Sequence, residues 1–367
     1  MLRKNRTSKL ILLSGGGTGG PSSVPLALAK AYYTLDDSIR FVFIGSNPVL
    51  EKKLFAEIFE SLKIDYYSIP AGKWRRYFSL LNFLDIFKVI YGFFKAFILL
   101  ARIKPELIIS AGSFASVPLV WAGKILNIKI IVHQQDLRPG LANRLMAPLA
   151  DLITVTFEKS LTDYGQRSMW IGNPHLDYED REDLNISRLN ENIRQEPLIF
   201  LSGGGGGSVA LNELLIKAVD FLPKNWRIVQ QTGKDKNNFK LERNNYIVAE
   251  NFSHNQFLSW AKKADIIISR AGLSSLTEFS YLAKALIVVP IPKSHQEDNA
   301  QYFADQGAAI YLKQETLSGE RLADEILALW QDNQKRKELE SAISKIMPQN
   351  AALKGASIIK KIIYESA

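Results

Sequence analysis

The 367-residue chain contains no cysteine and only four histidines. The absence of cysteine excludes disulfide bonds, thiolate metal sites and a cysteine nucleophile, and it suits a reducing compartment. The chain also lacks an uninterrupted apolar run of the roughly 18 residues that a membrane-spanning helix requires. The apolar run from Leu10 to Leu13 is too short for the core of a signal peptide, so we interpret it as a first strand. We therefore expect a protein that is neither disulfide-bonded nor transmembrane.

Acidic residues are fewer than basic ones, and the formal net charge is +9. This excess favours an acidic partner such as nucleic acid, anionic lipid or a phosphate-bearing substrate. Apolar residues make up 47% of the chain, which is typical of a folded globular protein. At roughly 100 to 200 residues per domain, the length predicts two domains with a cleft between them.

Two series of apolar segments rich in β-branched residues alternate with stretches of helical periodicity. The first series occupies residues 10–14, 40–45, 106–111, 128–133 and 151–156, and the second occupies 197–202, 226–231, 246–250, 264–269 and 285–290. This alternation predicts parallel α/β sheets. Both series begin with a strand, a serine and a glycine run in register, at residues 10–20 and 198–208. We therefore predict two related Rossmann-like domains, with ligands at the carboxyl ends of the strands.

A polar segment without apolar periodicity separates the two series. It predicts an N-terminal domain over residues 1–174, a linker over 175–195 and a C-terminal domain over 196–350. Residues 351–367 have helical spacing of apolar residues and either pack on their own domain or cross back to the first.

Gly15, Gly17 and Gly20 have the G-x-G-x-x-G spacing of a turn that holds a pyrophosphate at a helix N-terminus. The second predicted strand ends Gly45-Ser46-Asn47, without the acid that binds an NAD ribose, and no Walker lysine follows the glycines. These features argue against NAD. A tight turn without a ligand is the alternative for each glycine run.

Residues 72–104 crowd aromatic side chains among basic ones around a single acid. Lys88, Lys95 and Arg102 recur every seven residues and share one narrow helical face, so the rest of that helix must be buried or lie in lipid. Apolar and cationic anchors suggest docking on an anionic membrane surface, and the residues predicted to make it are Trp74, Arg75, Arg76, Phe78, Phe83 and Lys88. The alternative is a helix that packs on the sheet with a solvated basic stripe. Nucleic acid is not an expected partner, because no RNA- or DNA-binding motif is present.

Several spaced motifs together resemble the MurG family over nearly the whole chain. They are GGGTGG at 15–20, GSFASVP at 112–118, HQQDLRPGLANRL at 133–145, GNP at 172–174, SGGGGGSVALN at 202–212, SRAGLSSLTEF at 269–279 and SHQEDNAQYFADQGAA at 294–309. The resemblance implies a two-domain B-type glycosyltransferase that moves N-acetylglucosamine from its UDP derivative to a polyprenyl-diphosphate-linked acceptor, from lipid I to lipid II. It implies a peripheral enzyme at the cytoplasmic face of the cell membrane.

The resemblance also implies site residues. Glu278 matches the residue that holds the donor ribose, residues 272–275 match the turn at the UDP phosphates, Phe252 should present its main chain to uracil, and His295 and Gln296 should face the donor sugar. The expected donor-binding residues are Thr18, Gly19, Asn143, Gly204, Gly205, Phe252, Gly272, Leu273, Ser274, Ser275, Glu278, His295 and Gln296. The expected acceptor-binding residues are Gly16, Gly17, Gly112, Ser113, Phe114, Gln134 and Gln135.

The chain departs from the family pattern at the proposed catalytic base. The family histidine after GGTGG is Pro21 here, and the usual HEQN reads His133-Gln134-Gln135-Asp136. We predict Asp136 as the base and His133 as the second candidate, although His133 fits a core or turn position equally well. The chain has no D-x-D triplet, so neither a metal nor another cofactor is expected.

Three alternatives stay open at this point. The enzyme could use another glycolipid or polysaccharide acceptor, it could be a catalytically silent UDP-sugar-binding relative, or it could be an NAD-dependent oxidoreductase, which the missing ribose acid disfavours.

Overall fold

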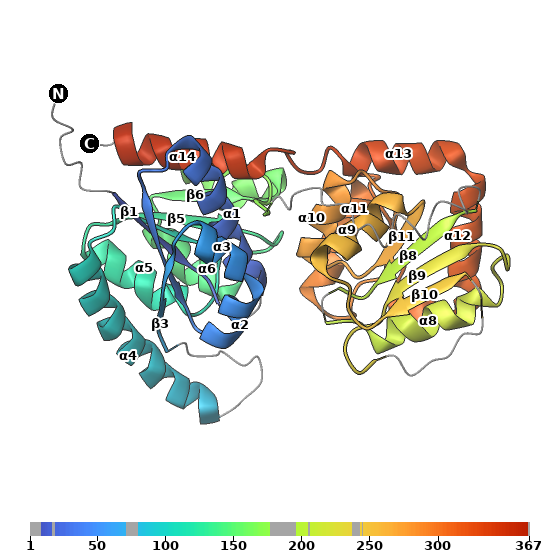
Figure 1. Ribbon diagram of the computed structural model, residues 1–367, viewed down its shortest axis with the longest axis horizontal. Helices are drawn as coiled ribbons and strands as arrows, with labels where there is room; N and C mark the ends of the chain where they lie inside the picture. Colours follow the sequence, from blue (N-terminus) through green and yellow to red (C-terminus); the bar gives the residue numbers. More distant parts are fainter. Residues whose placement is uncertain are drawn as a thin grey trace. The chain divides into compact units, whose positions relative to one another are not determined.

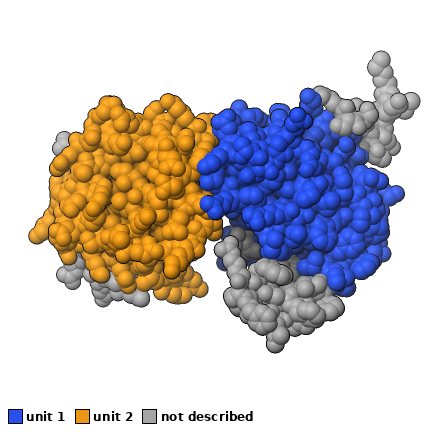
Figure 2. Space-filling model, turned by 180° about the vertical axis from the view of Figure 1, so that it is seen from behind, with its two compact units in different colours: residues 1–177, 350–367 blue, residues 178–349 orange. Residues whose placement is uncertain are grey.

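The computed structural model describes residues 9–16, 19–70, 80–176, 196–204, 206–236, 243 and 245–365. The chain divides into two compact units, shown in different colours in Figure 2. Unit 1 comprises Met1–Asp177 and Asn350–Ala367, and unit 2 comprises Tyr178–Gln349. The C-terminal segment therefore belongs with the N-terminal one, whereas most of the predicted linker lies outside the described residues.

Unit 1 contains a parallel sheet of seven strands in the order β3-β2-β1-β4-β5-β6-β7 (Figure 1). The strands are β1 (Leu10–Ser14), β2 (Arg40–Gly45), β3 (Asp65–Ser68), β4 (Leu107–Ser110), β5 (Lys129–Gln134), β6 (Leu152–Val155) and β7 (Ser168–Trp170). The central strands are buried on both faces, which is why they read as continuous apolar runs in the sequence.

Helices cover both faces of this sheet. They are α1 (Gly19–Leu35), α2 (Pro48–Leu54), α3 (Ala56–Ser61), α4 (Leu80–Ile103), α5 (Ser116–Ile125), α6 (Leu141–Met146) and α14 (Ala351–Glu365). Ile11 and Leu13 of β1 pack with α1 and α14 on one face, and Leu12 packs with α4, α5 and α6 on the other. Alternate side chains of β1 therefore belong to two separate apolar layers, one on each face of the sheet.

Unit 2 contains a parallel sheet of six strands in the order β10-β9-β8-β11-β12-β13. The strands are β8 (Leu198–Ser202), β9 (Arg227–Gln231), β10 (Tyr246–Ala249), β11 (Ile266–Ser269), β12 (Leu286–Val288) and β13 (Ile310–Tyr311). With β8 in the place of β1, this order repeats the first six strands of unit 1. The prediction of two Rossmann-like α/β folds is confirmed.

The helices of unit 2 are α8 (Val209–Val219), α9 (His254–Lys263), α10 (Leu273–Tyr281), α11 (His295–Asp305), α12 (Gly319–Gln331) and α13 (Asn333–Ile343). One face of the sheet packs against α8, α12 and α13. On the other face, Phe200 of β8 contacts Phe257 of α9, whose ring stacks on Phe279 of α10. These contacts fix the helices that carry the candidate site.

Among the residues that the structure describes, no helix combines the length and the apolar character needed to cross a bilayer. The predicted membrane residues Trp74, Arg75, Arg76 and Phe78 lie outside the described part of the chain. Phe83 and Lys88 belong to α4, whose main chain is described at these two positions.

Candidate active site

Glycine-rich and polar turns follow the carboxyl ends of β1, β4 and β5, which are neighbours in the sheet of unit 1. Ligands of open parallel sheets bind at this edge. Gly16 and Gly112 have positive φ angles of 146° and 111°, which explains why glycine is required there. Of the other predicted residues of the first turn, Gly17 and Thr18 lie outside the described residues, and Gly19 is the first residue of α1.

Polar side chains crowd the side of Gly16 on which a Cβ would project. A Cβ at this position would lie 2.6 Å from Ser46 Oγ, 3.0 Å from Ser113 Oγ and 3.4 Å from Glu51 Oε1. Glu51 is 1% exposed, and its Oε2 accepts a hydrogen bond of 2.5 Å from the hydroxyl of Tyr66. The turn after β1 therefore contacts a buried carboxylate that the sequence patterns did not reveal.

Serine hydroxyls brace the turn after β4. Ser116 Oγ donates to the Gly112 carbonyl oxygen at 2.9 Å, and it lies 2.8 Å from Ser14 Oγ at the end of β1. Ser113 has a φ of 81°, a strained value for a residue other than glycine, and its Oγ accepts from Ala115 N–H. The predicted acceptor residue Phe114 is half-buried in this turn.

His133 is buried inside β5, which argues against its predicted role as the second candidate for the base. Its ring is 0% exposed, with Nδ1 3.0 Å from Thr154 Oγ1 and Nε2 3.1 Å from Thr156 Oγ1. Burial lowers the pKa of His133 to about 3. A buried ring that resists protonation, with both nitrogens next to threonine hydroxyls, is a poor base for an acceptor hydroxyl.

Gln134 and Asn143 brace the loop that follows β5. Gln134 is 1% exposed; its Nε2 donates to the Asp136 carbonyl oxygen, and its Oε1 accepts from Asn143 Nδ2 at 2.6 Å. The side chain of Gln134 is therefore not available to an acceptor, contrary to the prediction. Asn143 is 6% exposed in unit 1, and its Oδ1, which has no partner among the described residues, faces the Gly112 turn. Its predicted contact with the donor stays a prediction.

Asp136 is half-buried in the same loop. Gln135 Nε2 donates to the carbonyl oxygen of Gly20 at 3.3 Å, so the loop lies against the first turn of α1. Pro21 occupies that first turn, where a helix needs no backbone N–H donor and tolerates proline. The predicted role of Asp136 as the base stays a prediction, and its neighbour Gln135 contacts the turn that carries Pro21 in place of the family histidine.

In unit 2, the glycine turn after β8 is held from several directions. Lys236 Nζ donates to the carbonyl oxygens of Gly206 and Gly207, and Gln231 Nε2 reaches the Gly204 carbonyl oxygen at 3.4 Å. Ser208 caps the N-terminus of α8 by accepting from Leu211 N–H. Gly204 has a φ of 78°, whereas Gly205 lies outside the described residues.

Arg270, directly after β11, places a buried positive charge at the same edge of the sheet. The side chain makes five hydrogen bonds of 2.6 to 3.2 Å, to Ser208 Oγ, the carbonyl oxygens of Val289 and Pro290, and Gln314 Oε1. All of these acceptors are neutral oxygens. Burial lowers the pKa of Arg270, but a guanidinium stays charged at any physiological pH. The surroundings of Arg270 therefore favour an anionic ligand.

Two further helix N-termini reach this edge. Gly272 is the N-cap of α10 and offers no side-chain acceptor, so the N–H groups of the first turn, at Leu273, Ser274 and Ser275, remain for another acceptor. Ser294 caps α11, which begins with the exposed His295 and with Gln296, whose Nε2 approaches the Gly272 turn. Asn299 Nδ2 holds the Ala271 carbonyl oxygen at 3.2 Å. Dipoles and free N–H groups make this a candidate phosphate site.

Glu278 and Phe252 lie together with His254 in unit 2. The side chain of Glu278 is 18% exposed, and its Oε1 lies 3.7 Å from Nδ1 of His254. Burial raises the pKa of Glu278 to about 8. The N–H of Phe252 donates to Gln231 Oε1 at 3.2 Å, so its carbonyl oxygen is the main-chain group left for a ligand.

Sequence reasoning missed Glu51, Gln231, His254 and Asn299 as members of the site. Gln231 is the last residue of a predicted strand, and His254 is the first residue of α9, two positions after Phe252. These two positions are the features of the sequence that could have pointed to them. Asn299 lies within the motif at 294–309 but had no role assigned to it, and no motif contains Glu51, Gln231 or His254, because each joins the site through a contact with a distant part of the chain.

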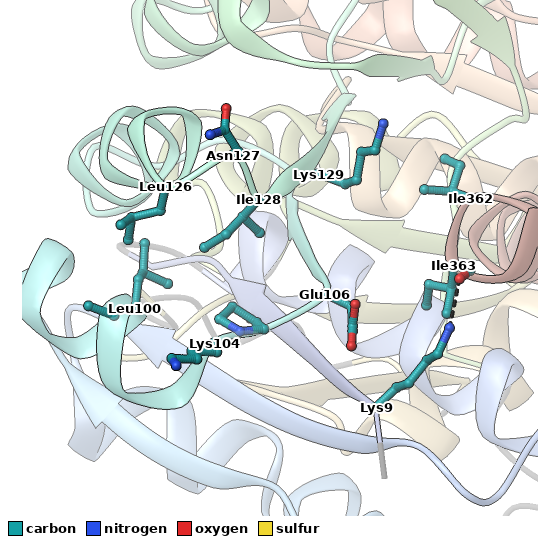
Figure 3. Close-up of a pocket in the computed structure, with 12 residues that line it drawn as sticks. Lys9, Leu100, Lys104, Glu106, Leu126, Asn127, Ile128, Lys129, Ile362 and Ile363 are labelled. Atoms are coloured by element: carbon teal, nitrogen blue, oxygen red, sulfur yellow. Dashed lines mark hydrogen bonds between the residues drawn. The ribbon is translucent and has the colours of Figure 1, made fainter. Parts of the chain in front are cut away.

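A cavity of about 630 Å³ lies elsewhere in unit 1 (Figure 3). Its lining includes Lys9, Glu106 and Lys129, which stand at the amino ends of β1, β4 and β5, and Lys9 Nζ donates to the carbonyl oxygen of Ile363 at 2.8 Å. The glycine turns follow the opposite ends of these strands. The cavity is therefore not part of the candidate active site.

Residues 11–155 match the glycosyltransferase family 28 N-terminal domain, and residues 198–357 match the family 28 C-terminal domain. A Borreliella afzelii protein named UDP-N-acetylglucosamine–N-acetylmuramyl-(pentapeptide) pyrophosphoryl-undecaprenol N-acetylglucosamine transferase is 33% identical over 98% of both chains. A Staphylococcus aureus protein of the same name is 33% identical over 88% of this chain and 91% of its own. The chain belongs to the MurG family.

The solved structure of Acinetobacter baumannii MurG has the same fold, with a TM-score of 0.76 at 22% identity over 96% of this chain and 99% of that one. The predicted family, the B-type fold and the expectation of a sugar-transferring enzyme are confirmed. At Pro21 and Asp136 this MurG-family chain departs from the family motifs described above.

Proposed function

We propose that the protein transfers N-acetylglucosamine from UDP-N-acetylglucosamine to a polyprenyl-diphosphate-linked acceptor, the step from lipid I to lipid II of peptidoglycan precursor synthesis. The observation that carries the proposal is the edge of the unit 2 sheet at which Arg270 and the N-termini of α8, α10 and α11 accompany the half-buried Glu278. The names of the relatives, which span nearly the whole chain, support the same donor and acceptor.

The donor groups find complementary partners in unit 2. The diphosphate would accept hydrogen bonds from the first-turn N–H groups of α10, and the Glu278 carboxylate would accept the ribose hydroxyl protons. The carbonyl oxygen of Phe252 would accept from uracil N3–H, and His295 and Gln296 would face the sugar. These groups supply the stabilisation that a leaving UDP needs, so the transfer is expected to need no metal.

Unit 1 would bind the acceptor and provide the base. The backbone of the Gly16 and Gly112 turns would hold the acceptor diphosphate, with Ser113, Phe114 and Gln135 nearby. Asp136 would take the proton from the acceptor sugar hydroxyl as its oxygen attacks the anomeric carbon. The bond from that carbon to UDP breaks, UDP keeps the electron pair, and the anomeric configuration is inverted.

Transfer of radiolabelled N-acetylglucosamine to a short-chain lipid I analogue, in the presence of EDTA, tests the reaction. Wild type should turn over without metal, and Asp136→Asn should lower kcat by about 100-fold or more. Asp163→Asn, at an exposed acid of the same unit, is the matched control. Turnover of Asp136→Asn within a few-fold of wild type would exclude Asp136 as the base.

Because Pro21 replaces the histidine proposed as the base in the family, a catalytically silent relative is the alternative function to test. A catalytically silent relative would bind UDP-N-acetylglucosamine without turnover on any lipid acceptor, and the same assay with a binding measurement separates it from an enzyme that uses another acceptor.

The protein would work as a peripheral enzyme on the anionic cytoplasmic face of the cell membrane. Ala96 and Leu100 of α4 are buried against the sheet, whereas Tyr91, Phe94 and Ile98 are 62%, 60% and 53% exposed. Lys95 and Arg102 are exposed along the same helix. Helix α5, which packs on α4, adds the exposed side chains of Trp121 and Ile125. Apolar side chains among cations are typical of interfacial docking, and each cation contributes about 1 kcal/mol near an anionic surface.

Liposome sedimentation with vesicles rich in phosphatidylglycerol tests this docking. Replacing Tyr91, Phe94 and Ile98 by serine should release the protein from the vesicles, as should the separate set Trp74, Phe78 and Phe83 to serine. The matched control replaces the exposed apolar residues Val209 and Phe221 of unit 2. Unchanged sedimentation of both sets would exclude docking by this segment. Added RNA should not displace the protein from the vesicles.

A further inference from the structure

The segment from Phe252 to His254 leads from β10 into the first residue of α9 and contacts another part of unit 2 at each end. At one end, Gln231 Oε1 accepts from the N–H of Phe252 at 3.2 Å. At the other, Nδ1 of His254 lies 3.7 Å from Oε1 of Glu278. This short segment therefore links the Phe252 main chain, which is proposed to bind uracil, with the Glu278 carboxylate, which is proposed to bind the ribose.

The imidazole of His254 is not needed to start helix α9. Ser253 and Gln256 form a complete capping box, in which each side chain accepts from the other residue's backbone N–H. A helix N-terminus also disfavours a cationic side chain. The approach of His254 to Glu278 is therefore not a by-product of helix capping.

Glu278 needs such a neighbour if it is to bind a diol. It is the only charged residue in α10, and its burial favours the protonated form, which has lost one acceptor site. A carboxylate accepts two hydroxyl protons only when it is ionised and correctly turned. An imidazole within 4 Å limits the rotation of the carboxylate, and when the imidazole is protonated it also favours the ionised form of Glu278.

We propose that His254 is a positioning residue for the donor, which orients the Glu278 carboxylate toward the two ribose hydroxyls and so sets the preference for ribonucleotides over 2′-deoxyribonucleotides. The inference rests on the proposed function, because it assumes that a uridine diphosphate group binds in unit 2. To the proposed function the inference adds that this site distinguishes ribose from 2′-deoxyribose, and that His254 is responsible for the distinction.

Isothermal titration calorimetry with UDP and 2′-deoxy-UDP tests the proposal on the full chain. Wild type should bind UDP about tenfold or more tightly than 2′-deoxy-UDP, because the deoxy compound leaves a carboxylate oxygen unpaired. In His254→Ala this ratio should fall to about threefold or less, chiefly through weaker binding of UDP. Asn255→Ala, one residue further along α9, is the matched control and should keep the wild-type ratio.

Thermal unfolding of the same variants separates positioning from folding. His254→Ala should unfold at the wild-type temperature, because the capping box stays intact. An unchanged ratio in His254→Ala, or an equal fall in Asn255→Ala, would overturn the inference while leaving UDP binding as proposed. If wild type fails to bind UDP at all, the donor assignment fails and the inference falls with it.

Discussion

Glu278 is proposed to bind the donor ribose, and its burial is expected to lower the stability of unit 2. Burial raises its pKa to about 8, above the ordinary value of 4.5. Between these two pH values the folded protein holds a proton that the unfolded chain has released, so the free energy of unfolding falls as pH rises through this window. Glu278→Gln cannot ionise and should therefore be more stable than wild type at pH 7.5, by about 1 kcal/mol or more, but not at pH 4.5. Urea unfolding of unit 2 at the two pH values measures this difference.

The same substitution should weaken the binding of UDP about tenfold or more, because a neutral amide cannot accept two hydroxyl protons as well as a carboxylate does. Glu213→Gln, at an exposed acid of α8, is the control for the loss of charge. A stability gain of equal size at both pH values would show that burial does not govern the proton on Glu278.

Residues 133 to 136 show how far the sequence could predict the site. The motif located the loop after β5 and named both His133 and Asp136, but it did not distinguish the buried ring from the half-buried carboxylate. The burial of His133 depends on Thr154 and Thr156, which reach it from and just beyond the neighbouring strand β6. Side-chain contacts between strands more than 20 residues apart leave no local pattern in the sequence.

At the scale of elements, the turns after β8 and β9 contact each other through glycines. Gly207 has a φ of 64°, and a Cβ at this position would overlap the Thr232 carbonyl oxygen and Gly233 Cα. Gly207→Ala should therefore destabilise unit 2 by about 2 kcal/mol or more and weaken the binding of UDP. Gly206→Ala is the matched control, because a Cβ there would meet no atom within 4 Å.

Thermal unfolding and UDP titration of the two alanine variants check this prediction. Equal stability of Gly206→Ala and Gly207→Ala would mean that the two turns can separate at little cost. The resemblance to the family identified this glycine run, but the sequence did not show which glycine the contact between the turns requires.

Strands were predictable where they are buried on both faces. All ten predicted segments overlap a strand of the structure, and nine of these strands are largely buried, which demands continuous apolar residues; the tenth, the edge strand β10, is partly exposed. The strands β3, β7 and β13 were not predicted. They have two to four residues each and are partly exposed, so their composition does not differ from that of loops.

At the scale of the whole molecule, each unit has its own core, yet unit 1 is assembled from both ends of the chain. Ala356, Ile359 and Ile363 of α14 are buried in the apolar layer that contains α1. Lys354 Nζ donates to the Trp170 carbonyl oxygen, and the Tyr364 hydroxyl donates to Asp36. Two buried isoleucines contribute about 3 to 6 kcal/mol, a large share of the usual stability of a domain.

Ile359→Asp should therefore unfold unit 1 and leave unit 2 folded. Ile359 is 1% exposed, and an unpaired carboxylate at that position would cost several kcal/mol. Transfer to the lipid acceptor should be lost, while the affinity for UDP should stay within about threefold of wild type, because the residues proposed to bind UDP belong to unit 2. Ser357→Asp, at an exposed position of the same helix, should keep both activities. A parallel loss of UDP binding in Ile359→Asp would show that donor binding needs a folded unit 1, and hence that the two units do not divide the substrates between them.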